Sequence, residues 1–186
     1  RTAKELQGYI SKLEEIRVPV IAAVHGGVIG GALDLITACD MRFASSDAFF
    51  CIQEINIGMA ADVGTLQRLP KIIPDAKMRE MAYTGRRMLA DEAKDSGLVG
   101  EIYETQDKML DEVHKLAAEI ASKSPVAIYG LKAVMNYSRD HNVSDSLDFN
   151  ALWSGAMLSQ TDMAEAMTAQ MEKREANFDK RIDVKK

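Results

Sequence analysis

The fold is decided by VHGGVIGGALDLITACDMRFASSDAFFCIQEINIGMAADVG, residues 24–64. An apolar run at 18–24 leads into this stretch, and a glycine-rich turn at 26–31 follows the run. This pattern is typical of a buried parallel strand that meets the start of a helix. Because backbone N–H groups at a helix start have no intrahelical partner, such a turn can hold an anion or a developing oxyanion. The stretch therefore predicts a strand, a glycine turn and a helix at 32–39.

Three carboxylates follow the turn in mostly apolar surroundings: Asp34, Glu54 and Asp62. Asp34 falls in the first turn of the expected helix, where a carboxylate complements the helix dipole. Glu54 comes after the apolar segment 48–52, and either a surface loop or a catalytic site accounts for it. Asp62 precedes an expected helix at 63–73 and can serve as its N-cap. Anion-stabilising amides and poorly solvated carboxyl groups are together the parts needed to move protons on carbon next to a carbonyl.

The order of these motifs resembles the core signature of the enoyl-CoA hydratase/isomerase (crotonase) superfamily. The resemblance begins with PVIAAVHGGVIGGALDLITACD at 19–40 and continues through 49–69 and 82–99. Within the superfamily, the sequence is most similar to the Δ3,5-Δ2,4-dienoyl-CoA isomerases. The discriminating segments are QEINIG at 53–58, MAADVGTLQRLP at 59–70 and SRDH at 138–141.

The resemblance implies a role for four residues. Gly31 matches the glycine whose backbone N–H forms half of the oxyanion hole for the thioester. Glu54 matches the glutamate that meets the carbon next to the thioester. Asp34 stands where hydratases carry a glutamate that handles water, and Asp62 stands where hydratases have a glycine and dienoyl isomerases an aspartate. The two aspartates together favour the isomerase over the hydratase.

The chemistry of a 3,5-dienoyl thioester gives a reason for the pair formed by Glu54 and Asp62. Loss of a C2 proton produces an extended dienolate, whose negative charge an oxyanion hole stabilises. The 2,4-diene then needs a proton at C6, four carbons farther along the chain. Two carboxyl groups, one ionised and one protonated, can serve both ends. We expect Glu54 to be the base at C2 and Asp62 the acid at C6, or the reverse, with Asp34 tuning its neighbours.

Other functions stay open at this point. An enoyl-CoA hydratase or a Δ3-Δ2-enoyl-CoA isomerase would share Gly31 and Glu54 but would not need Asp62. A non-catalytic or RNA-binding crotonase-fold protein would keep only the fold. An RNA-binding member would need a lysine-rich helix facing solvent, whereas residues 1–17 and 105–122 carry mixed charges.

The chain is expected to have two regions. Alternating strands and helices in residues 1–104 predict an α/β fold with parallel strands, which the resemblance makes a crotonase-like spiral of βαβ turns carrying the active-site residues. Residues 105–186 are predicted to be helical, with Thr105 and Pro125 at helix starts, and to serve packing and oligomerisation. The resemblance implies trimers, commonly paired into hexamers. It also implies that earlier βαβ turns, with the second oxyanion amide and much of the coenzyme A pocket, are missing.

Composition bounds the function further. The 186 residues are 47% hydrophobic and 27% charged, enough for a substantial core. A net charge of −5 gives no support to nucleic-acid binding, and no apolar stretch approaches the roughly 20 residues of a membrane span. Cys39 and Cys51 lie in apolar surroundings and are expected to be reduced. The spacing of the histidines and cysteines predicts no metal site.

The resemblance also supplies the expected substrate and compartment. The substrate is a fatty acyl-CoA thioester of unsaturated fatty acid β-oxidation, and no cofactor is expected because coenzyme A is part of the substrate. The compartment would be the mitochondrial matrix or the peroxisome in a eukaryote and the cytoplasm in a bacterium.

Overall fold

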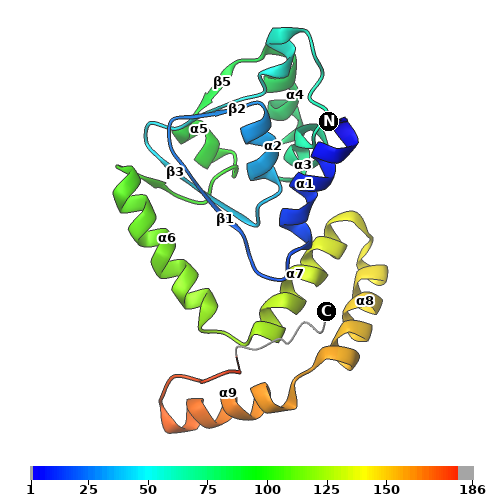
Figure 1. Cartoon of the computed structure of the whole chain (residues 1–186), viewed down its shortest axis with the longest axis vertical. Coiled ribbons are helices and arrows are strands. Elements are labelled where there is room, and N and C mark those ends of the chain that lie inside the picture. The colour runs from blue at the N-terminus through cyan, green and yellow to red at the C-terminus, as the bar shows by residue number, and fades with distance from the viewer. Residues whose placement is uncertain (1, 180–186) are drawn as a thin grey trace. The chain divides into compact units, whose positions relative to one another are not determined.

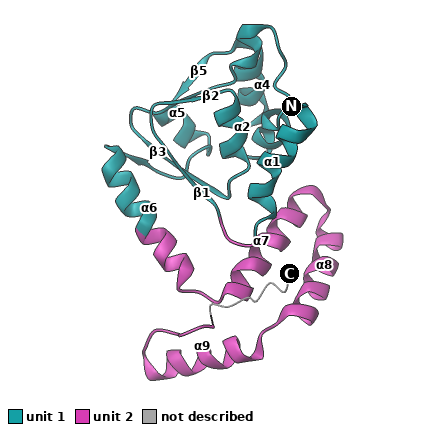
Figure 2. Ribbon diagram, in the orientation of Figure 1, with its two compact units in different colours: residues 1–16, 20–114 teal, residues 17–19, 115–186 magenta. Residues whose placement is uncertain are grey.

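The structure is a computed structural model that describes residues 2–179 (Figure 1). The chain divides into two compact units, coloured separately in Figure 2. Unit 1 comprises Arg1–Ile16 and Val20–His114, and unit 2 comprises Arg17–Pro19 and Lys115–Lys186.

Unit 1 contains the described strands together with mostly short helices. The strands are β1 (Ile21–Val24), β2 (Gly27–Ile29), β3 (Met41–Ser45), β4 (Phe49–Cys51), β5 (Arg87–Leu89) and β6 (Ile102–Tyr103). The helices are α1 (Ala3–Glu15), α2 (Gly31–Thr37), α3 (Thr65–Arg68), α4 (Asp75–Thr84) and α5 (Ala90–Asp95). Two 3₁₀ turns join them, η1 (Glu54–Ile57) and η2 (Leu69–Lys71). This alternation confirms the predicted α/β class.

The strands pair in two sheets. One sheet has the order β1-β3-β6 and is parallel throughout, as predicted. The other has the order β2-β4-β5, with β2 parallel and β5 antiparallel to the central β4. β2 is a correction to the sequence prediction, because the glycine turn does not pass directly from a strand to a helix. Val28 is buried and pairs with Phe50, so the segment forms a strand of its own before α2 begins.

The core of unit 1 lies between these sheets and the helices that follow them in the chain. Its fully buried side chains include Leu33 of α2, Phe50 of β4, Met81 of α4 and Met88 of β5. Side chains of α2, which follows the glycine turn, and of β4, which pairs with β2, belong to this same core. Cys39 and Cys51 are both buried, and no disulfide joins them in the structure.

The helices of the second region are confirmed. They are α6 (Gln106–Ala121), which begins in unit 1, α7 (Pro125–Asp140), α8 (Val143–Met157) and α9 (Gln160–Glu172). The side chains of Ser124, Asn142 and Ser159 accept backbone N–H groups at the starts of α7, α8 and α9. Of the helices between residues 2 and 179, none combines the length and apolar character needed to cross a membrane.

Candidate active site

The glycine turn is held in a conformation that suits glycine. Gly30 has φ 54°, in the left-handed region, and its N–H donates to the Cys51 carbonyl at 3.0 Å. The Gly30 carbonyl accepts the N–H groups of Leu33 and Asp34, which starts α2. Gly31 is exposed, and its N–H has no hydrogen-bond partner among residues 2–179. This amide is therefore available to an oxygen atom from outside.

Glu54 lies against this turn. It begins η1, and a Cβ atom added at Gly30 would lie 3.1 Å from Glu54 Oε1. The side chain is half-buried, and no residue between 2 and 179 donates a hydrogen bond to its carboxylate. The structure thus brings Glu54 to the glycine turn, across 24 positions of sequence from Gly30. A half-buried carboxylate with open acceptors beside a free amide is suited to act as a base.

Asp34 is buried, with 1% of its surface exposed. Its Oδ1 accepts the backbone N–H of Thr65, the first residue of α3, at 2.6 Å. Its Oδ2 is buried and has no hydrogen-bond partner within the described part of the chain. The predicted place in the first turn of a helix is confirmed. The contact also gives Asp34 a second role, because it fills the capping position of α3 from a different helix.

Asp62 is exposed and does not cap α3. The N-cap residue is Gly64, which has no side chain to offer, so the alternative that Asp62 is a helix cap is wrong. The Asp62 carbonyl accepts a hydrogen bond from Gln7 Nε2 of α1 at 2.7 Å. Its carboxylate has no hydrogen bond to any residue from 2 to 179. The backbone of Asp62 is therefore held, while the side chain is left free for another partner.

Arg68 keeps the loop before α3 close to α1. Gly64 has φ 139°, and a Cβ atom there would lie 1.9 Å from Arg68 Nη1, so only glycine fits. The guanidinium donates to Glu14 at 2.7 Å and to Ser11 at 2.9 Å, both on α1. These contacts fix the segment that carries Asp62.

An apolar cavity of about 360 Å³ is lined in part by the segment between Glu54 and Asp62. Residues adjacent to Glu54 and Asp62 in the sequence, Ile55 and Ala61, both line it. A cavity of this size and character is in the range of small-molecule binding sites. The lining residues are Ile52, Ile55, Met59, Ala60, Ala61, Leu66, Met78, Arg79, Ala82 and Tyr83.

Sequence reasoning missed a group of contacts behind Glu54. Asn56 Nδ2 donates to Gln53 Oε1 at 3.2 Å and to the Gly85 carbonyl at 3.1 Å. Cys51 Sγ donates to the same carbonyl at 3.2 Å. Burial raises the pKa of the Cys51 thiol; the charge of Arg87 opposes this rise and the Glu54 carboxylate adds to it. The pairing of Asn56 with a residue 29 positions away leaves no local signal in the sequence.

Comparison with known proteins identifies the family. Residues 1–181 match the family model described as enoyl-CoA hydratase/isomerase, and the chain belongs to this family. The crotonase resemblance and the crotonase-like fold are thereby confirmed. A solved structure of a probable enoyl-CoA hydratase/isomerase from Mycobacterium abscessus is similar, with a TM-score of 0.88 and 33% identity over 95% of this chain and 68% of the other.

Within the family, the chain is similar to proteins named as isomerases. It is 49% identical to the mitochondrial Delta(3,5)-Delta(2,4)-dienoyl-CoA isomerase of Mus musculus, over 94% of this chain and 56% of that protein. It is 47% identical to the peroxisomal Delta(3,5)-Delta(2,4)-dienoyl-CoA isomerase of Arabidopsis thaliana, over 97% of this chain and 65% of that protein. The chain thus spans little more than half the length of the mouse relative.

Proposed function

We propose that the protein is a Δ3,5-Δ2,4-dienoyl-CoA isomerase that acts on unsaturated fatty acyl-CoA thioesters in β-oxidation. The observation that carries the proposal is the pair of carboxylates, Glu54 and Asp62, on one segment that also lines an apolar cavity. Glu54 additionally lies against the glycine turn. The names of the mouse and Arabidopsis relatives support the same reaction.

The proposed reaction uses one carboxylate at each end of the diene. The Gly31 N–H binds the thioester oxygen, and Glu54 removes a proton from C2. The electron pair of the broken C–H bond delocalises over the thioester and both double bonds, giving a dienolate. Asp62, protonated at this stage, delivers its proton to C6, and the double bonds come to rest at C2 and C4. Glu54 then carries the proton and Asp62 is ionised, so exchange with water resets the pair.

The environment of Asp34 argues against hydration. A carboxylate that handles water must reach it, whereas Asp34 is 1% exposed and already holds the Thr65 N–H. Asp34 therefore supports the backbone three residues after Asp62 and does not take part in proton transfer. This arrangement suits an isomerase better than a hydratase.

The second region suits self-association into trimers or hexamers. Val143, Leu147 and Leu152 of α8 are 77%, 62% and 75% exposed. Met163, Met167 and Met171 of α9 are 43%, 60% and 76% exposed, so they are not core residues of this chain. Large apolar side chains exposed in series favour a subunit interface. Sedimentation of the full-length protein tests this, because a monomer at micromolar concentration would contradict it.

The proposed compartment is the mitochondrion or the peroxisome in a eukaryotic cell, following the relatives' names. The proposal includes no cofactor, because every bond change is a proton transfer.

The decisive assay compares two reactions of the full-length protein. One follows conversion of a 3,5-dienoyl-CoA into the conjugated 2,4-dienoyl-CoA by ultraviolet absorbance, and the other follows hydration of a 2-enoyl-CoA. We expect the isomerisation to have the higher kcat/KM. Hydration as the faster reaction would contradict the proposal.

A further inference from the structure

The turn that carries Glu54 is short and weakly anchored. η1 has four residues and is followed by its C-cap Gly58, which has φ 77°. Backbone hydrogen bonds close the turn on itself, such as that from Met59 N to the Glu54 carbonyl at 2.9 Å. In the part of the chain from residue 2 to 179, the side chains of η1 make one hydrogen bond to a residue beyond the turn and its flanks. That bond runs from Asn56 Nδ2 to the Gly85 carbonyl at 3.1 Å.

The Asn56 amide also donates a hydrogen bond to Gln53, the residue before Glu54. Its Nδ2 donates to Gln53 Oε1 at 3.2 Å, so the same NH₂ group serves both Gln53 and Gly85. Two acceptors match the two hydrogens of an amide nitrogen. Gln53 and Asn56 flank Glu54 in the sequence, and their contact therefore restricts the backbone on both sides of it.

Gly85 is shaped to receive this amide. It has φ 62°, and a Cβ atom there would lie 2.4 Å from both Asn56 Nδ2 and Asn56 Oδ1. Any larger residue would push the Asn56 amide away. The carbonyl of Gly85 also accepts the Cys51 thiol at 3.2 Å, which ties β4 to the same point.

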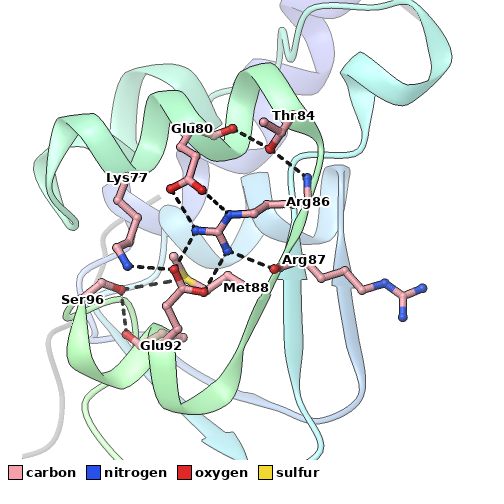
Figure 3. Close-up of polar contacts among 9 residues, drawn as sticks. Lys77, Glu80, Thr84, Arg86, Arg87, Met88, Glu92 and Ser96 are labelled. Atoms are coloured by element: carbon pink, nitrogen blue, oxygen red, sulfur yellow. Dashed lines mark hydrogen bonds and ion pairs between the residues drawn. The ribbon is translucent and has the colours of Figure 1, made fainter.

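The residue after Gly85 is fixed by an ion-pair network (Figure 3). The Arg86 guanidinium lies between Glu80 of α4 and Glu92 of α5, at 2.9 Å and 2.7 Å. Lys77 adds a third contact by pairing with Glu92 at 2.8 Å. The Gly85 carbonyl, which accepts the Asn56 bond, therefore lies next to a residue that ion pairs hold between α4 and α5. We call this region the Gly85 junction.

We propose that Asn56 is a positioning residue for Glu54, anchoring η1 to the Gly85 junction so that the carboxylate stays beside the glycine turn. The inference rests on the proposed function, because the effect of position is expressed through proton removal at C2. A base must stay within hydrogen-bond reach of the proton that it removes, and a misplacement of about 1 Å can cost about 10²-fold in rate.

The test replaces Asn56 in the full-length protein and separates rate from binding. In Asn56→Ala we expect kcat for isomerisation to fall at least about tenfold, with KM changed by less than about threefold. Exchange of the C2 protons of a bound acyl-CoA with deuterated water should slow in proportion to kcat. Gln106→Ala is the matched control, because Gln106 is an exposed carboxamide at the start of α6 whose side chain has no hydrogen bond within residues 2–179. Its kcat should stay within about twofold of wild type.

Gly85→Ala provides an independent variant that leaves Asn56 in place. Its methyl group displaces the Asn56 amide, so kcat should fall in the same way. In the double variant, Asn56→Ala removes the group that is displaced, and the two losses should not multiply. Multiplicative losses would overturn the coupling of Asn56 to Gly85.

The outcomes separate this inference from the proposed function. Wild-type protein without isomerase activity would overturn both. Wild-type activity that Asn56→Ala preserves within about twofold would overturn the positioning role alone. A rise in KM that accounts for the whole loss in kcat/KM would also overturn it, because the residue would then act on binding.

Discussion

The ion pairs of Arg86 make a quantitative prediction about stability and pH. Arg86 and Glu92 each keep 29% of their side-chain surface exposed. Hydrogen bonds from Arg86 and Lys77 lower the pKa of Glu92 from 4.5 to about 2. At about 1.4 kcal/mol per pKa unit, a shift of this size corresponds to about 3 kcal/mol as an upper bound. Solvent screening of the partly exposed pair reduces this, and we expect Arg86→Gln to lower the free energy of unfolding by about 1–2 kcal/mol at pH 7.

The sign of the pH dependence follows from the lowered pKa. The folded protein binds the Glu92 proton less tightly than the unfolded chain does. The contribution is therefore fully present above about pH 4.5 and is lost as the pH falls toward 2. Urea unfolding of wild type and Arg86→Gln should accordingly give stabilities that differ at pH 7 and converge as the pH is lowered through this window.

Arg79→Gln is the matched control. Arg79 pairs with Asp75 on the same helix at 2.6 Å, but both side chains are 57% exposed. Its loss should cost much less than the loss of Arg86, because solvent screens the exposed pair. If the two substitutions lowered the free energy of unfolding equally, the stabilising role of the Arg86–Glu92 pair would be refuted. A loss of stability in Arg86→Gln that does not change with pH would refute it too.

Two further predictions concern the aspartates. Asp62→Asn should lower the kcat of dienoyl isomerisation by at least about 100-fold with little change in binding, because it removes the acid at C6; activity within a few-fold of wild type would contradict that role. Asp34→Ala should destabilise the protein by about 1–3 kcal/mol in urea unfolding, because the Thr65 N–H loses its acceptor. Asp34→Asn should cost less, since its amide oxygen can still accept; a larger loss in Asp34→Asn than in Asp34→Ala would argue against the capping contact.

The elements that follow local rules could be predicted from the sequence. Helices α6 to α9 show apolar residues at helical spacing and have capping residues at their starts, both of which are local signals. The short strands β2 and β5 are harder to predict from the sequence. β2 contains Gly27 and has three residues, so its strand character comes from pairing with β4 and not from its own propensity. β5 follows a turn and likewise depends on its pairing with Phe49–Cys51.

The sequence predicted which residues belong to the candidate site, but it did not predict the contacts that they make. The order of motifs pointed to Gly31, Asp34, Glu54 and Asp62, and the structure adds the approach of Glu54 to the glycine turn. The contact of Asp34 with the Thr65 N–H crosses 31 positions of sequence, and only the fold brings those atoms together. The junction at Gly85 escaped prediction for the same reason.

The central claim is that Glu54 removes the C2 proton and Asp62 delivers the proton at C6. The most direct measurement incubates an acyl-CoA with each variant of the full-length protein in deuterated water and follows label at C2 by NMR. We predict that Glu54→Gln abolishes exchange at C2, whereas Asp62→Asn retains measurable exchange while failing to complete isomerisation. Exchange lost equally in both variants, or retained in Glu54→Gln, would contradict this division of roles.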